Sequence, residues 1–229
     1  MARAVTGTGK RAYKAPLSRD RIEEAAAEMI EAEGLEAFSI RRLAAALGYE
    51  AMSIYHYFPS KAHLFDALLD RMVASMAIAP AELPWLERLR ITARSYRDAA
   101  LRRPQFFKFA AIHRMNTPTG LAYLEALLAI FRDAGFDAET AARAFRALGY
   151  YVSGAGLDEA VGYAKGPSAA EPVPADVAAR AYPLITAANP YFREGVRDAT
   201  FDLGFEMMLE GIARMHRAMP ATKRRATKP

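Results

Sequence analysis

The side chains best suited to chemistry lie between residues 38 and 61. Arg41 and Arg42 point away from an apolar stripe, and Arg is the side chain that bonds bidentately to guanine. A short helical segment further along leaves small, hydroxylated and aromatic residues on its open faces, namely Ala51, Met52, Ser53, Tyr55 and His56. The stability of so short a helix does not explain this row. The row suits insertion into a groove of DNA.

The elements that must position these residues are two short helices joined by a tight turn. Ser39 is a good N-cap for the first helix, which ends at Gly48. Pro59 stops the second helix. The buried positions repeat at helical spacing and comprise Ile40, Leu43, Ala44 and Leu47, then Ile54, Tyr57 and Phe58. Two short helices with a Gly-containing turn predict a helix-turn-helix.

A preceding helix is predicted from Ser18, another N-cap, to Gly34, with Ile22 and Met29 on its buried face. Residues 1–17 show no periodicity and predict a flexible basic arm. The arm is either a solvated tail or a segment that touches DNA phosphates or a minor groove.

Catalytic motifs are missing from the sequence. The stretch Tyr151 to Gly156 contains a Ser but lacks the first Gly of a nucleophile elbow, and it reads as helix. The chain has no Cys, and its four His show no i, i+4 pair for a metal. We therefore expect no enzyme activity, no metal and no cofactor.

The charge of +5 is unevenly distributed. Nine of the 31 basic side chains fall in the terminal segments 1–19 and 218–229, which contain no acid, so the body between them is net acidic. No apolar run approaches the roughly 20 residues of a membrane span, and no signal peptide is visible. A cytoplasmic location is expected, and basic charge alone is no argument for DNA binding.

The run from Ser18 to Leu64 resembles the DNA-binding domain of the TetR family of transcriptional regulators. Gly48 at the turn, Ile54-Tyr55, and Phe58-Pro59-Ser60-Lys61 carry the resemblance. It implies phosphate contacts from Ser39, Tyr55 and Lys61. It also implies base-reading positions at Arg41 and at Glu50, Ala51, Met52, Ser53 and His56. Arg42 points outward beside Arg41 and is a further candidate DNA contact; the alternative is that the two Arg side chains form an ordinary solvated pair. Where many members have His before the Phe, this chain has Tyr57.

A break at residues 79–84 divides the chain. We predict a DNA-binding domain over 18–79, including a linking helix, and a helical effector-binding and dimerisation domain over 80–219, followed by a basic tail over 220–229. Bulky apolar and convergent polar residues after Pro104 predict a small-molecule pocket. Its candidate residues are Phe106, Phe107, His113, Arg114, Asn116, Tyr150 and Tyr151; for any one of them, plain core packing is the favoured alternative.

Two stripes on the last long helices are candidates for a homodimer interface, which the resemblance places there as a four-helix bundle. The first consists of small residues, Gly149, Ser153 and Gly156. The second has coiled-coil spacing and comprises Phe201, Phe205, Met208, Ile212 and Met215. Packing within one protomer is the alternative for both stripes.

The segment 166–195 is rich in Pro and Ala, with a possible helix over 177–188 disturbed at Pro183. It is interpreted as a cap, as a partner-reaching loop or as disordered chain. The sequence thus predicts an all-α, dimeric, ligand-released repressor that binds an inverted-repeat DNA operator. The alternative is a helical ligand-binding or interaction protein that no longer reads DNA.

Overall fold

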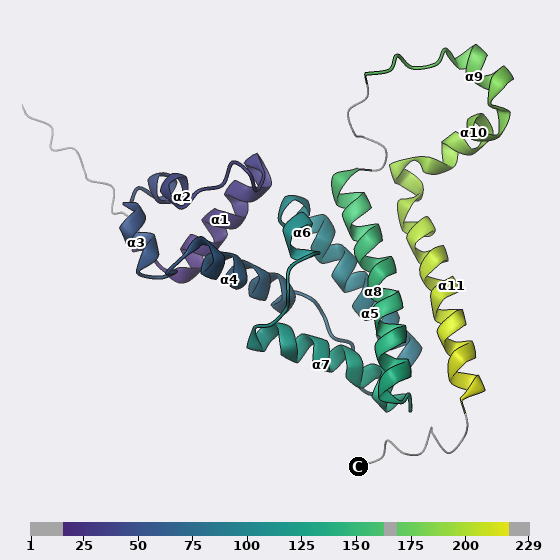
Figure 1. Ribbon diagram of the computed structural model, residues 1–229, viewed down its shortest axis with the longest axis horizontal. Coiled ribbons are helices and arrows are strands. Elements are labelled where there is room, and N and C mark those ends of the chain that lie inside the picture. Colours follow the sequence, from purple (N-terminus) through teal and green to yellow (C-terminus); the bar gives the residue numbers. More distant parts are fainter. Residues whose placement is uncertain (1–15, 163–168, 220–229) are drawn as a thin grey trace, which may run out of the picture. The chain divides into compact units, whose positions relative to one another are not determined.

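The structure, a computed structural model, describes residues 16–162 and 169–219 (Figure 1). Every regular element in these ranges is helical, which confirms the all-α class. The predicted arm over 1–17 and the tail over 220–229 lie almost entirely outside the described residues. The helices of the N-terminal half are α1 Arg19–Glu33, α2 Ile40–Leu47, α3 Ala51–Tyr55, α4 Lys61–Ala74, α5 Trp85–Arg102 and α6 Pro104–Ala110. The later elements are α7 Pro118–Asp133, α8 Ala138–Val161, α9 Ala175–Ala181, α10 Pro183–Ala188, the 3-10 turns Asn189–Phe192 and Glu194–Val196, and α11 Arg197–Ala218.

The chain forms two compact units that meet inside α4, between Leu64 and Phe65. The boundary expected from the sequence lies after this helix, so the assignment of the whole of α4 to the DNA-binding domain stays a prediction. α4 is one uninterrupted helix and contributes its first turn to one unit and the remainder to the other.

The first unit packs α1, α2 and α3 around a small apolar core. Ile22, Ile30, Leu43, Ile54 and Phe58 have no exposed surface. The N-caps predicted at α1 and α2 are confirmed, because each Ser hydroxyl accepts a backbone N–H three residues on. The caps and the core together fix where each helix begins and which face it buries.

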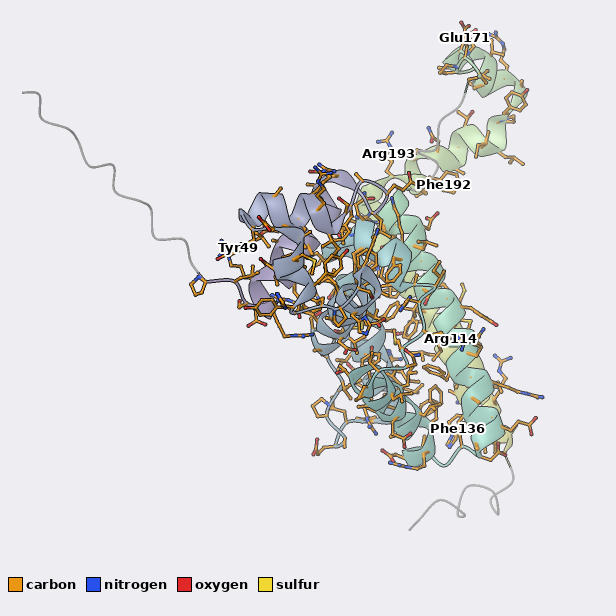
Figure 2. The ribbon with its side chains drawn as sticks, turned by 60° about the vertical axis from the view of Figure 1, so that its left-hand side comes forward. Tyr49, Arg114, Phe136, Glu171, Phe192 and Arg193 are labelled. Carbon is orange, nitrogen blue, oxygen red and sulfur yellow. The ribbon has the colours of Figure 1, made fainter. Side chains whose placement is uncertain are left out.

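The second unit is a bundle in which α5, α7, α8 and α11 surround a core rich in aromatic rings. α8 and α11 run side by side (Figure 1). Phe136, between α7 and α8, lies at the end of the bundle and meets the rings of Trp85, Phe131 and His216 (Figure 2). This cluster packs aromatic rings from α5, α7 and α11 against one another at one end of the bundle.

Ion pairs connect the bundle's helices as well. Arg97 of α5 is buried and binds Glu159 of α8 through Nε at 2.7 Å and Nη2 at 3.1 Å. The same guanidinium donates to Asp198 of α11 at 2.7 Å. One side chain therefore ties three helices together near the end of the bundle where α11 begins.

The segment between α8 and α11 contains two short helices, and the break expected at Pro183 is confirmed because α9 ends before it and α10 begins at it. Its apolar side chains Tyr182, Leu184 and Tyr191 are exposed. Among the described helices, none is both long and apolar enough to cross a bilayer.

Candidate nucleic-acid interface and ligand cavity

The turn between α2 and α3 is closed by Gly48, whose left-handed backbone (φ 73°, ψ 33°) disfavours any residue with a Cβ. The Gly48 N–H donates to the carbonyl of Ala45 at 2.9 Å, and the Tyr49 N–H donates to that of Ala44 at 2.8 Å. These bonds satisfy the last carbonyls of α2. α3 therefore leaves the turn in a fixed direction, with Tyr49 on the outside (Figure 2).

α3 is anchored to the core by one buried side chain, and its other side chains are exposed or half-buried. Ile54 is fully buried, whereas Met52 is 64% exposed and Tyr55 and His56 are exposed. Ala51 and Ser53 are half-buried, and Glu50, just before the helix, is exposed. The predicted groove-facing positions thus share the open side of one helix.

The two arginines of α2 have different surroundings, although both are exposed. Arg42 forms an ion pair with Glu33 at the end of α1 and donates to the Ala37 carbonyl at 2.8 Å. Within the described residues, Arg41 makes no hydrogen bond or ion pair. Arg42 braces α1 against α2, and Arg41 keeps its five N–H donors for another molecule.

The start of α4 approaches the start of α2. Lys61 is exposed, and its Nζ donates to the Phe38 carbonyl at 3.3 Å and lies 5.3 Å from the centre of the Phe38 ring. Ser39, the next residue, caps α2. Two predicted phosphate contacts are therefore brought together, one an ammonium and the other at a helix N-terminus, where anions are favoured.

Tyr57 has a positioning role that sequence analysis missed. Its hydroxyl donates to the Leu17 carbonyl at 2.7 Å, and its own carbonyl accepts from Arg19 at 2.7 Å. The Arg19 guanidinium also lies 4.2 Å from the centre of the Phe58 ring. These contacts fasten the beginning of the described chain to the end of α3. Helical spacing predicted a buried Tyr57 but carried no sign of its hydrogen bond.

A cavity of about 840 Å³ opens in the second unit between α5, α7, α8 and the chain after α6. His113, Arg114 and Tyr150 line it, as the sequence suggested. Phe106, Phe107, Asn116 and Tyr151 do not line it. The cavity is an open concavity of the size that drug-like ligands occupy.

The four misplaced residues have other partners or positions. Phe106 and Phe107 are buried in ring contacts, Phe106 with Phe65 and Phe107 with Tyr96. Tyr151 turns toward α11, where its hydroxyl donates to the Phe201 carbonyl at 2.7 Å. Asn116 is exposed in the loop before α7. Aromatic composition alone could not separate core rings from cavity rings.

The sequence-predicted dimer stripes mostly face the protomer's own core. Phe201, Phe205 and Ile212 are buried there, and Met208 packs against the same core. Ser153 bonds to Tyr96 at 3.0 Å, and Gly156 abuts Ala100 and Phe107. Gly149 borders the cavity. A 4-3 spacing marks a buried face without saying which helix covers it. These positions are therefore corrected to internal packing, except Gly149 and the exposed Met215, whose place in a dimer interface stays a prediction.

Four large apolar side chains on α8 and α11 are well exposed in the described protomer. They are Tyr150, which also borders the cavity, and Leu203, Met207 and Met215. Gly154 and Gly211 lie at exposed positions of the same helices. We call this set of exposed residues the outer α8–α11 face.

Two hydrogen bonds connect α4 to the cavity side of the second unit. His113, which lines the cavity, bonds through Nε2 to the Asp66 carboxylate at 3.0 Å. Thr117 donates to Asp70 one turn further along α4. The rings of Phe65 and Phe109 also meet edge to face at 5.0 Å. The chain after α6 thus lines the cavity and is also hydrogen-bonded to α4.

Sequence models of two domains match the chain. "Bacterial regulatory proteins, tetR family" matches residues 22–68, and "Tetracyclin repressor-like, C-terminal domain" matches residues 79–216. Together they cover the helix-turn-helix unit and nearly all of the bundle.

Individual relatives agree with these matches. The HTH-type transcriptional repressor DrrR1 of Streptomyces coeruleorubidus is 34% identical over 65% of this chain and 57% of its own length. The class A tetracycline repressor from transposon 1721 of Escherichia coli is 29% identical over 86% of this chain and 91% of its own.

A solved structure also matches, that of the TetR family protein ActR of Streptomyces coelicolor in complex with actinorhodin. It superposes with a TM-score of 0.69 at 25% identity and covers 88% of this chain and 99% of ActR. The chain belongs to the TetR family and is a DNA-binding transcriptional regulator rather than an enzyme.

Proposed function

We propose that this chain is a cytoplasmic, ligand-released repressor that binds, as a homodimer, an operator made of two inverted half-sites. The observation that carries the proposal is the open side of α3, where Met52, Tyr55 and His56 are exposed on a helix fixed by Ile54. Repression rather than activation is supported by the names of DrrR1 and the class A tetracycline repressor.

Base reading is assigned to Arg41 and to the open side of α3. Arg41 bonds to a guanine edge, Ala51 and Met52 contact thymine methyl groups, and Ser53 bonds to either kind of base edge. Glu50 and His56 flank this set at exposed positions. Ser39, Tyr55 and Lys61 contact phosphates and set the register of the helix in the groove.

The outer α8–α11 face is assigned to the dimer. Two copies of the face form a four-helix bundle across a two-fold axis, which covers Leu203 and Met207. Glycine at positions 154 and 211 lets the helices approach closely, because it adds no side chain between them. The two-fold axis then places the two α3 helices for an inverted repeat.

Release is assigned to the cavity and its bonds to α4. A ligand that displaces the chain around His113 disturbs the bond to Asp66 and, next to it, that of Thr117 to Asp70. α4 then shifts and, because its first turn holds Lys61, the helix-turn-helix unit of each protomer moves with it. The two helix-turn-helix units of the dimer then no longer match the spacing of the half-sites. The complex of ActR with actinorhodin supports ligand binding in a bundle of this fold.

An electrophoretic mobility shift with the DNA upstream of the protein's own gene tests the proposal. We expect one retarded dimer complex, and footprinting should reveal two protected half-sites. Lys61→Ala should weaken binding to all sequences. Because each of the two protomers loses a phosphate contact, it should also lower the steepness of log K against log salt by about two. A protein that shows no preference for its upstream DNA over random DNA would contradict the proposal.

A further inference from the structure

Several hydroxyl-bearing side chains line the cavity. Thr92 and Tyr96 of α5, Tyr123 of α7 and Ser153 of α8 all line it. Tyr96 and Ser153 bond to each other at 3.0 Å. Thr92 and Tyr123 are 4% and 7% exposed, and their hydroxyl oxygens have no hydrogen-bond partner within the described residues. Two residues of the cavity wall therefore carry buried hydroxyl groups whose hydrogen bonds no described residue satisfies.

These two hydroxyls favour a ligand with hydrogen-bond acceptors. A buried polar group without a partner is unfavourable, so a carbonyl or ether oxygen beside it gains more than an apolar group would. Burial, with a smaller contribution from the nearby Tyr96 phenol, raises the pKa of Tyr123 above its ordinary value. Tyr123 therefore keeps its proton at neutral pH and acts as a donor.

Charge is distributed asymmetrically around the cavity. The basic lining residues are His113, Arg114 and Arg146, and no Asp or Glu belongs to the described lining. Arg114 and Arg146 are exposed, and the Arg146 guanidinium lies 4.9 Å from the centre of the Tyr150 ring. The outer edge of the cavity is thus basic, whereas the buried hydroxyl groups are neutral. A cationic ligand is disfavoured and an acidic one is favoured at the outer edge.

The walls carry six aromatic rings of Tyr and Phe, which offer flat surfaces to a flat molecule. They belong to Tyr96, Tyr123, Phe131, Phe145, Tyr150 and Phe205. We propose, on the basis of the proposed ligand-released function, that the effector is a fused-ring quinone or ketone. Its oxygen atoms bond to Thr92 and Tyr123, and an acidic group lies toward Arg114 and Arg146.

Calorimetry with three probes of matched ring shape tests this assignment. Anthraquinone-2-carboxylate has both proposed features, anthracene-2-carboxylate lacks the carbonyls, and 2-(trimethylammoniomethyl)anthraquinone reverses the charge. We expect the quinone carboxylate to bind at least about tenfold more tightly than either of the others, which corresponds to the loss of one good hydrogen bond or of the charge match.

Two variants identify the hydroxyls. Tyr123→Phe and Thr92→Val should each remove most of the preference for the quinone over the anthracene. Tyr182→Phe, at an exposed tyrosine outside the cavity, is the matched control. Without ligand, Tyr123→Phe should melt at the same temperature as the wild type or higher, because it removes a buried hydroxyl that has no protein partner. A loss of binding then does not come from unfolding.

Equal affinity for the three probes, no binding of the quinone carboxylate, or an unchanged preference in Tyr123→Phe would overturn the assignment. These measurements contain no DNA, so a failure of operator binding leaves them intact. If the quinone carboxylate binds as expected but does not release the operator, the ligand class stands and the proposed release mechanism fails.

Discussion

Arg41 and Arg42 show how two identical neighbours can take different roles. Arg42 is engaged by Glu33 and the Ala37 carbonyl, whereas Arg41 has no protein partner within the described residues. Helical spacing predicts both side chains on the open face of α2, and both were candidate DNA contacts. The difference depends on where α1 ends, which helical spacing alone does not give.

Arg41→Ala should relax the preference for one base pair in each half-site, at a cost of about 1–3 kcal/mol for that base pair. Selection from a half-site randomised one position at a time measures this. Arg42→Ala is the matched control, and it should leave base preference unchanged while lowering the free energy of unfolding by about 0.2–1 kcal/mol. A uniform loss of affinity across all sequences in Arg41→Ala would assign Arg41 to phosphate instead.

Individual residues could be predicted from the sequence where a residue type in its local context has a single structural role. Ser18 and Ser39 are N-caps and Gly48 is the left-handed turn residue, because these roles depend on local backbone geometry. Prediction failed for Phe107 and Tyr151, because a buried ring can face a core or a cavity. Thr92 and Tyr123 were missed as candidate ligand contacts for another reason. What marks them is that their buried hydroxyls have no partner within the described residues, and the sequence does not show this.

At the scale of elements, the Arg97 ion pairs connect α5, α8 and α11. Arg97 and Glu159 are both nearly fully buried, whereas Asp198 is exposed. Removing Glu159 leaves a buried guanidinium with one solvated partner. Loss of Glu159 therefore destabilises the fold mainly because it leaves the buried Arg97 charge without a buried partner, and less because an attraction is lost.

Glu159→Ala should lower the free energy of unfolding by about 3 kcal/mol, because it leaves the buried Arg97 charge poorly compensated. Urea denaturation followed by circular dichroism measures the change. Asp198→Ala is the comparison at the same guanidinium and should cost clearly less, since its carboxylate is already in water. Equal losses in the two variants would show that burial does not govern this network.

Acid should destabilise the bundle through its helix-to-helix carboxylates. Hydrogen bonds from Arg90 lower the pKa of Glu206, and those from Arg88 and Arg132 lower the pKa of Asp133. The unfolded chain therefore takes up protons at a higher pH than the folded one. The stabilisation is complete above the ordinary carboxyl pKa of about 4 and is lost as pH falls through the lower folded values.

The melting temperature should accordingly drop as pH is lowered from about 5 to about 2. Glu206→Gln should reduce the steepness of this drop, because it removes one proton-uptake site. Glu210→Gln, at an exposed carboxylate on the same helix, serves as the control. A pH profile of Glu206→Gln that parallels the wild type would contradict the assignment.

The seam on α11 was predicted correctly as a buried face and wrongly as an intermolecular one. Its residues Phe201, Phe205 and Ile212 contribute to the bundle core. Spacing identifies which side of a helix is covered, but the covering partner depends on how all the helices pack. The dimer surface expected on these helices is proposed instead for the outer α8–α11 face.

At the scale of the whole molecule, Leu203→Glu should convert the dimer to a monomer, because it places two like charges near the two-fold axis of an apolar interface. Sedimentation velocity at micromolar concentration measures the mass, and operator affinity should fall with it. Leu121→Glu on α7 is the control, since Leu121 is 56% exposed and Leu203 is 59% exposed. A dimer that persists in Leu203→Glu would exclude this face.

Most of the architecture followed from the sequence. Capped helices, Gly turns and Pro breaks gave the helix order, including the split at Pro183, because they act over a few residues. The cavity walls and the outer face depend on contacts between residues far apart in the chain. Asp66 and His113, for example, show no relationship in the sequence, yet they are bonded in the fold.

The continuity of α4 has a geometric consequence. The helix starts at Lys61 in one unit and ends at Ala74 in the other, so the chain passes from one unit to the next without leaving the helix. Each residue of an α-helix advances the chain by about 1.5 Å and rotates it by about 100°. One residue inserted between Leu64 and Phe65 would turn the part of α4 after the insertion by about 100° relative to its first turn, whereas seven inserted residues would add nearly two full turns and nearly restore the original orientation. We therefore expect length changes in this helix to be tolerated by whole turns rather than residue by residue.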